Sequence, residues 1–419
     1  ATEPLVPAAA EILENAFNHV TKALDIQTEA PVWASPGAKK RARWKRRPFF
    51  LYGSPNDFQQ SNIAIVGDGT GGVTEPFKDR FMVYNDGTRE WLNEVTTHEF
   101  VHIMQFHVLV SGFWKSGRIL KTIVYPLWMM EGMAGYLTHG IESTLEEVTI
   151  RDAATSGGLI PLTKLEHFGH LKPHQITLAY KQGSNALGFL ASQYGMRKVG
   201  DMLRLFENRL ETSQVLHDLI GIDAFEFDKK FREYTETRYW REVRRDRLRE
   251  PSAFGGKLTR RKDNIPQFNT SPAFSPDRKR MYYLSSANGH PSQLRELDLR
   301  TGRWRKAAGL PWAKIENVPL GNFANLSRML DLSSDGRWLA FAGSRNHADA
   351  IYLYDTKKGK LERRPMPGFM MVSQPRFSPN GRHLVFSGMK RSITDLYLYD
   401  LQTRKIEQLT DDVRDDAMP

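Results

Sequence analysis

The sequence predicts an α+β domain followed by an all-β region that is built from repeats. The first observation is a string of the form H-E-x-x-H at residues 98–102, inside a segment with helical periodicity of apolar residues. The second is another helical segment, residues 128–136, which carries one carboxylate, Glu131, among apolar and small residues. The third is a change, beyond about residue 265, to short strand-like segments in which one pattern occurs three times.

The composition is that of a folded protein with room for two domains. The chain has 419 residues, of which 40% are hydrophobic and 26% charged, and its formal net charge is +11. It contains no cysteine, which excludes disulfide bonds and a zinc site made of thiolates. No apolar run reaches the roughly 18 residues of a membrane-spanning helix, so we expect no transmembrane helix in this chain.

The start of the chain suggests export. It begins with Ala1 rather than Met, which fits a processed export product or a trimmed polypeptide, and we expect a periplasmic or extracellular protein. A helical pattern at residues 7–24 is followed by the densest basic run of the chain, from Lys39 to Arg47. Because no nucleic-acid-binding motif accompanies this run, we interpret it as a solvated loop and expect no nucleic acid partner.

Three strand-like segments come next, at residues 48–52, 62–66 and 80–84, all rich in β-branched and aromatic residues. Between the last two lies a glycine-rich segment, residues 67–72, which lacks the Gly-Lys-Ser/Thr ending of a phosphate-binding loop. We therefore interpret this segment as a turn rather than as a nucleotide site.

The H-E-x-x-H string is suited to binding a metal ion. On a helix over residues 91–110, His98 and His102 stand four residues apart, so both imidazoles project from one face, one turn apart. That spacing lets two ring nitrogens reach one ion at roughly 2.0–2.1 Å, the usual zinc–nitrogen distance. Glu99 is displaced around the helix by one residue, where it can act as general base toward a water on the open side of the ion.

The segment at residues 128–136 supplies the candidate third ligand. It follows Pro126, a helix-start signal, and Glu131 is costly among apolar neighbours unless it is paired or bound to a metal. Two histidines, one glutamate and an open water position form a standard catalytic zinc site. The small residues beside Glu131 predict close packing of this helix against another; they are Gly132, Ala134 and Gly135.

Together the two strings resemble the gluzincin family of zinc metallopeptidases, in which a glutamate from a following helix completes the H-E-x-x-H site. The resemblance covers about residues 45–240 and implies a zincin-like α+β fold with Zn²⁺ held by His98, His102 and Glu131. Glu131 lies 29 residues after His102, farther than in many members, so residues 111–125 are expected to loop out. Five residues match the family string W-x-x-E-G-x-A-x-Y: Trp128, Glu131, Gly132, Ala134 and Tyr136.

The same resemblance implies a hydrogen-bond donor and a substrate-binding strand. Tyr180 and Gly183 match the family's Y-x-x-G segment, whose tyrosine donates a hydrogen bond to the oxyanion of the tetrahedral intermediate. An ordinary tyrosine at a helix start is the alternative for Tyr180. The strand at residues 81–84, just before the metal helix, is expected to be the edge that pairs with an extended peptide substrate.

Five other histidines compete for a functional role. The metzincin pattern needs a histidine six residues past His102, whereas His107 lies five past it. His139 shares roughly the helix face of Glu131, and we interpret it as a surface residue. The alternative is that it contacts a metal ligand without binding the metal itself. Residues 166–174 hold three histidines with Gly and Pro, and we interpret them as a solvated loop; a cleft lining or a second metal site is the alternative.

A domain boundary is expected after a long helical stretch. Helical periodicity continues from about Tyr180 to residue 249, with breaks at Gly195 and Gly221. A segment with Pro, Gly-Gly and basic residues follows and is the best boundary. The predicted units are a metallopeptidase-like domain at residues 1–250, a linker at 251–264 and the repeat region at 265–419.

The repeat region is predicted to form blades of a β-propeller. The strings F-S-P-D, L-S-S-D-G and F-S-P-N-G begin three units, and each is followed by a strand. Each unit ends in an alternating strand and an aspartate, at Asp298, Asp355 and Asp400. A period of about 40–50 residues with four strands is typical of a propeller blade. The strings resemble the TolB-like propeller repeats of bacterial proteins, over about residues 268–419.

Three blades make an incomplete propeller, because propellers typically have four to eight blades. The distance from Pro375 to Pro419 is one repeat length, so we expect the encoded protein to continue into another blade. The remaining blades would come from a downstream segment or from a second chain, which would then be a partner of this one.

The predicted function is zinc-dependent hydrolysis of peptide bonds in a peptide or protein substrate. Glu99 is the general base, Tyr180 steadies the oxyanion, and the propeller controls access or binds partners. No G-x-M-E-N-like string is present to bind a free amine, which favours an endopeptidase over an aminopeptidase. The alternative is a non-catalytic interaction or scaffold protein of an exported envelope assembly that works through its propeller. Such a scaffold has no need of a general base at Glu99.

Overall fold

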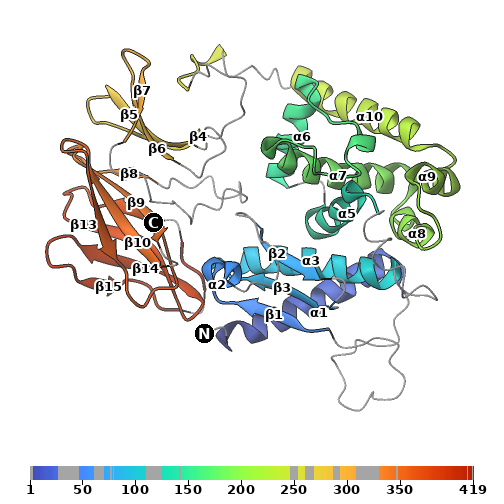
Figure 1. Ribbon diagram of the computed structural model, residues 1–419, viewed down its shortest axis with the longest axis horizontal. Coiled ribbons are helices and arrows are strands. Elements are labelled where there is room, and N and C mark those ends of the chain that lie inside the picture. The colour runs from blue at the N-terminus through green and yellow to red at the C-terminus, as the bar shows by residue number, and fades with distance from the viewer. Residues whose placement is uncertain are drawn as a thin grey trace.

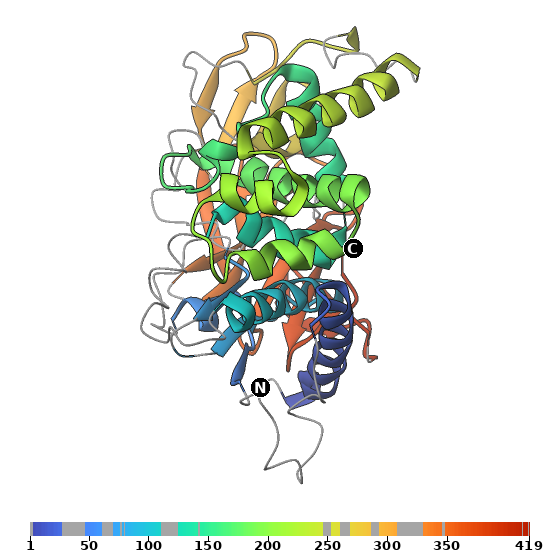
Figure 2. The ribbon, with the colours of Figure 1, turned by 90° about the vertical axis from the view of Figure 1, so that its right-hand side faces the viewer.

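In the computed structural model, a helical region and a β-sheet region lie side by side. Residues 127–245 are mostly helical and lie on one side, and the strands beyond residue 269 lie on the other (Figure 1). The view turned by 90° shows these helices stacked in front of the sheets (Figure 2). The structure describes residues 3–26, 47–60, 70–75, 78, 80–109, 125–140, 143–245, 253–259, 269–285, 293–307, 330–345, 348–412, 414–417 and 419.

A three-stranded sheet lies near the start of the chain. Its strands are β1 (Phe49–Tyr52), β2 (Gly72–Glu75) and β3 (Arg80–Tyr84), and their order is β1-β3-β2. β1 pairs with β3 in parallel, and β2 pairs with it antiparallel. The expectation that residues 81–84 form the edge is therefore wrong, because β3 has a neighbour on both sides. Its residues are almost all buried, as suits a central strand, and among the described strands the edges are β1 and the half-buried β2.

The helices agree with the periodicity of the sequence. The predicted helix at residues 91–110 is α3, the segment at 128–136 lies in α5, and the breaks at Gly195 and Gly221 follow the ends of α7 and α9. Gly221 has the left-handed conformation, with φ of 79°, that glycine adopts at little cost at a helix end. The helices are η1 (Glu3–Leu5), α1 (Val6–Ala23), α2 (Pro55–Gln59), α3 (Arg89–Leu109), α5 (Leu127–His139), α6 (Thr144–Ser156), η3 (Leu162–Lys164), α7 (Pro173–Tyr194), α8 (Arg197–Leu205), α9 (Thr212–Ile220) and α10 (Ala224–Arg245).

Helix α3 lies between the small sheet and the other helices. It contacts β2 and β3 on one side and α1, α5 and α8 on others, so it is buried nearly all round. Phe100, Val101, Ile103 and Met104 belong to the largest hydrophobic core of the protein. Because these side chains are enclosed on several faces, the polar string between them is fixed relative to its surroundings.

Helices α5 and α7 approach each other through two glycines, as the small residues of α5 predicted. A Cβ atom added at Gly132 would lie 2.4 Å from the carbonyl carbon of Gly183, and one added at Gly183 would lie 2.5 Å from the carbonyl oxygen of Trp128. Such distances leave no room for a side chain. The glycine of the Y-x-x-G segment therefore has a packing role, and this contact holds Glu131 and Tyr180 on adjoining helices.

The described residues of the repeat region form three four-stranded antiparallel sheets, one for each predicted unit. Neighbouring sheets share hydrophobic cores, which pack the second sheet between the first and the third. The sheets are open and do not close into a ring within the described part of the chain. Their strands are β4 (Asn269–Phe274), β5 (Arg280–Ser285), β6 (Gln293–Asp298) and β7 (Trp304–Lys306); β8 (Asp331–Leu332), β9 (Trp338–Arg345), β10 (Ala348–Asp355) and β11 (Lys360–Pro365); β12 (Met371–Phe377), β13 (His383–Lys390), β14 (Ile393–Asp400) and β15 (Ile406–Gln408).

The repeated strings form the same turn in each sheet. The serine hydroxyl donates a hydrogen bond to the side chain two residues on, from Ser275 to Asp277 at 2.6 Å and from Ser333 to Asp335 at 2.6 Å. In the third sheet the equivalent bond runs from Ser378 to the Asn380 amide oxygen at 2.7 Å. These local hydrogen bonds explain why Ser and Asp or Asn recur at the first turn of every unit.

The third sheet contacts the segment that leads into α3. The Asn85 side-chain amide donates a hydrogen bond to the Ser392 carbonyl at 3.0 Å, at the turn between β13 and β14. The backbone N–H of Arg89, the first residue of α3, donates to the Asp415 carboxylate at 2.9 Å. A carboxylate at this end of a helix stabilises the unpaired N–H groups there.

Several expectations concern residues outside the described ranges. They are the strand at 62–66, most of the basic run, the loop at 111–124 and half of the linker at 251–264. The division of the chain into domains stays a prediction. Among the described residues, no helix combines the length and apolar character needed to cross a bilayer.

Candidate metal centre

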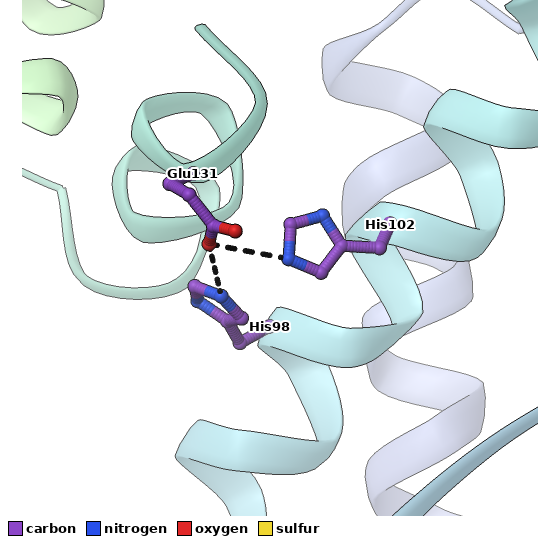
Figure 3. Close-up of side chains that lie close together, drawn as sticks. All are labelled: His98, His102 and Glu131. Atoms are coloured by element: carbon purple, nitrogen blue, oxygen red, sulfur yellow. Dashed lines mark hydrogen bonds and ion pairs between the residues drawn. The ribbon is translucent and has the colours of Figure 1, made fainter. Parts of the chain in front are cut away.

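Three predicted ligands converge between α3 and α5. His98 and His102 project from one face of α3, and Glu131 reaches toward them from α5 (Figure 3). The Oε2 atom of Glu131 lies 3.3 Å from Nε2 of His98 and 3.4 Å from Nε2 of His102. One ligand atom from each residue lies within 4.8 Å of the others, and within the described part of the chain this is the one such group of three.

The spacing of these atoms fits a zinc ion. Two ligands about 2.0–2.1 Å from a tetrahedral ion are about 3.3–3.4 Å apart, which is close to both carboxylate–imidazole separations. Imidazole nitrogen and carboxylate oxygen are among the donors that zinc prefers. The His98 side chain keeps 22% of its surface exposed, whereas His102 keeps 9%, so access to the group is from the side of His98.

The electrostatics of the group favour positive charge. Burial alone would lower the pKa of His102, but Glu131 and then Glu99 outweigh it and raise that pKa to about 9. Burial would raise the pKa of Glu131, but His102 and His98 hold it well below its usual range. The field that retains a proton on His102 would equally favour a cation between these side chains.

Gln105 supports this group, and the sequence analysis did not single it out. It is fully buried, and its side-chain oxygen lies 2.8 Å from Nδ1 of His102. Its side-chain nitrogen donates a hydrogen bond to the Met130 carbonyl at 2.9 Å, on the residue before Glu131. Because Gln105 accepts from Nδ1–H, the neutral form of His102, the form that binds a metal, has its lone pair on Nε2, the atom that faces Glu131. A polar residue three positions after His102, within an apolar run, is the sequence signal for this role.

Glu99 lies on the neighbouring face of α3, against the edge strand β2. It is buried, with 6% of its surface exposed. The Thr74 hydroxyl donates a hydrogen bond to its Oε2 atom at 2.6 Å. This carboxylate therefore belongs to the contact between helix and strand, while the two histidines belong to the contact between α3 and α5.

Tyr180 lies on α7, close to the carboxylates of Glu131 and Glu99. Glu131, burial and Glu99, in that order, raise the pKa of its hydroxyl well above the usual value. The phenol therefore keeps its proton at neutral pH and is available as a donor. Its ring contacts Phe168, with the centroids 5.4 Å apart in an edge-to-face arrangement. Tyr180 lies seven residues inside α7 rather than at its start.

The competing histidines lie apart from the group. His107 accepts a hydrogen bond from the Arg47 guanidinium at 3.4 Å. His139 is not a free surface residue, because its Nε2 atom lies 3.0 Å from a carboxylate oxygen of Glu94, one turn before His98 on α3. His167 and His170 are exposed in the loop before α7, which agrees with the interpretation of that segment as solvated. The side chain of His174 is outside the described part.

No protein-family model matches the sequence, and no curated protein matches it. TolB from Acinetobacter baumannii is 21% identical, with a TM-score of 0.31, over 38% of this chain and 35% of that chain. A putative TolB from Agrobacterium tumefaciens is 21% identical, with a TM-score of 0.28, over 38% of this chain and 53% of that chain. The β-propeller domain of the Trilobed protease from Pyrococcus furiosus is 14% identical, with a TM-score of 0.25, over 35% of this chain and 43% of that chain. The chain thus spans about a third to a half of these three structures, and similarity at this level assigns no activity.

Proposed function

We propose that this chain is a zinc-dependent peptidase whose metal ligands are His98, His102 and Glu131. The observation that carries the proposal is the convergence of two imidazole nitrogens and one carboxylate oxygen, spaced as in a tetrahedral zinc site. A buried carboxylate, Glu99, next to this group supplies the second requirement of a hydrolase, a base. Exposure of His98 leaves one side of the group open to a substrate.

Each side chain has a defined task in this proposal. Zinc, when bound, supplies a Lewis acid and lowers the pKa of water toward about 7. Glu99 accepts the proton of the attacking water and passes it to the leaving amine. Tyr180 donates a hydrogen bond where negative charge develops on the substrate carbonyl oxygen, a task for which a protonated phenol is suited.

The substrate proposed is an extended segment of a peptide or protein. Among the described strands β2 is an edge beside Glu99, and its outer backbone groups are the ones proposed to pair with such a segment. Cleavage within a chain is favoured over removal of its first residue, since no amine-binding string was found in the sequence. The third sheet contacts the start of α3, which suits a role for the sheets in access or partner binding. Export to the periplasm or the exterior remains part of the proposal.

Metal analysis of the purified protein tests the ligand set. We expect about one zinc per chain, and we expect His102→Ala and Glu131→Ala to lose it, because two remaining ligands hold the ion too weakly. His139→Ala is a matched control, since His139 is paired with Glu94 outside the group. Stoichiometric zinc in Glu131→Ala would overturn the assignment of the third ligand.

Hydrolysis of fluorescein-labelled casein tests the chemistry. Glu99→Gln preserves size but removes the base, so zinc content and folding should remain while turnover falls by several orders of magnitude. A zinc-loaded wild type that cleaves neither casein nor a quenched peptide library would instead favour the scaffold alternative. Activity that survives Glu99→Gln would exclude Glu99 as the base.

A further inference from the structure

The edge strand β2 holds the Glu99 side chain through one specific contact. The Thr74 hydroxyl lies 2.6 Å from Oε2 of Glu99 and 3.2 Å from its backbone oxygen. A hydroxyl has one proton to donate, and the shorter distance identifies the side-chain oxygen of Glu99 as the partner. A buried carboxylate needs such a donor, because unpaired charge is costly away from water. Within the described residues, Thr74 supplies it.

Gly72 makes room for the same side chain. A Cβ atom added at Gly72 would lie 2.6 Å from Cγ and 2.9 Å from Oε1 of Glu99. Gly72 and Thr74 are two residues apart on β2, so both face α3. Trp91 and Val95 lie two turns and one turn before Glu99 on α3, and a Cβ atom added at the preceding Gly71 would lie 3.0 Å and 3.1 Å from their side chains. The strand is thus shaped to this face of the helix, with a glycine at one oxygen of Glu99 and a hydroxyl at the other.

We propose that Thr74 is a positioning residue for Glu99. This inference rests on the proposed role of Glu99 as general base. The hydrogen bond fixes Oε2 and selects one orientation of a side chain that otherwise has three rotatable bonds. Oε1, on the Gly72 side, does not share this hydrogen bond and is the oxygen that accepts the proton of the attacking water in the proposal. Because Thr74 lies on the edge strand, the element that pairs with the substrate also sets the orientation of the base.

Kinetics with a quenched peptide that the wild type cleaves tests this role. Thr74→Val keeps the shape and removes the hydroxyl, so we expect kcat to fall about 10- to 100-fold, with KM and zinc affinity changed less than about twofold. Thr74→Ser restores the donor and should recover most of the lost kcat. In the Glu99→Gln background, Thr74→Val should have little further effect. Thr155→Val is the control, since Thr155 also donates a hydrogen bond, to Arg151 on the distant α6.

A second measurement does not depend on catalysis. Urea midpoints of the metal-free protein are compared for Thr74→Val, Glu99→Ala and the double variant. Coupled side chains give a double variant whose midpoint shift is smaller than the sum of the single shifts. Additive shifts, or an unchanged kcat in Thr74→Val, overturn the proposal. If the wild type is inactive but the midpoint shifts are coupled, only the proposed function is overturned. If Thr74→Val folds poorly, Thr74→Ser takes its place in both measurements.

Discussion

The contact between Gly132 and Gly183 allows a sharp test of how the candidate metal centre is assembled. Gly132→Ala would place a Cβ atom 2.4 Å from the Gly183 carbonyl carbon, 2.6 Å from its oxygen and 2.9 Å from its Cα. Non-bonded carbon atoms prefer about 3.5–4.0 Å, so α5 and α7 must separate locally by about 1 Å. All three neighbours are backbone atoms, which cannot move aside by a change of rotamer.

The energetic cost follows from this geometry. Overpacking of this kind costs about 1–3 kcal/mol, and the clash with backbone places Gly132→Ala at the upper end. Alanine regains about 1 kcal/mol relative to glycine within a helix. We therefore expect the free energy of unfolding to fall by about 2 kcal/mol, measured by urea denaturation of the metal-free protein.

The effect on zinc should be larger than the effect on stability suggests. Glu131 precedes Gly132, and its Oε2 atom must stay 3.3 and 3.4 Å from the two imidazole nitrogens. A shift of α5 by about 1 Å separates these atoms, and losses of 10- to 100-fold in metal affinity are usual when the support of a ligand is disturbed. Competition with a chromogenic chelator measures the zinc dissociation constant.

Two glycine controls separate packing from metal binding. Gly135→Ala meets the Ser184 side chain at 3.2 Å, which a small adjustment relieves, so stability and zinc affinity should stay near wild type. Gly200→Ala meets the Leu24 carbonyl oxygen at 2.5 Å, so it should lower stability about as much as Gly132→Ala while zinc affinity is unchanged. Wild-type zinc affinity in Gly132→Ala would refute the reasoning, because it would show that the helix spacing does not set the ligand geometry.

Three further predictions concern single side chains. Tyr180→Phe should lower turnover roughly 10²–10³-fold at unchanged zinc content, and unchanged turnover would leave Tyr180 with a packing role only. Gln105→Leu should weaken zinc binding about 10- to 100-fold in chelator competition, because His102 loses its support; wild-type affinity would contradict this. Burial, with a contribution from Asp415, raises the pKa of Asp86 from 3.8 to about 7. The folded state thus binds this proton more tightly than the unfolded state, and the free energy of unfolding should decline as pH rises from about 4 to 7. In urea titrations Asp86→Asn should reduce that decline by up to about 4 kcal/mol, and an equal decline in both proteins would rule the effect out.

Local patterns in the sequence were sufficient for much of the candidate centre. The positions of His98 and His102 on one helix face follow from their spacing, because a helix repeats every 3.6 residues. Glu131 was identified because a carboxylate in an apolar helix needs a partner. The three sheets follow from the repeated strings, whose serine and aspartate or asparagine close the same turn each time. In each case the cause of the structure lies within a few residues of the pattern.

Contacts between distant residues were decided by the tertiary structure. Strand order depends on pairing between segments far apart in the chain, so the sequence did not reveal that β3 is the central strand and β2 an edge of the described sheet. Thr74 lies 25 residues before Glu99, and nothing local marks it as the donor to that carboxylate. Asn85 and Ser392 are 307 residues apart, yet their hydrogen bond joins the third sheet to the start of the metal helix. Periodicity reports which face of an element is buried, but only the assembled core determines what that face meets.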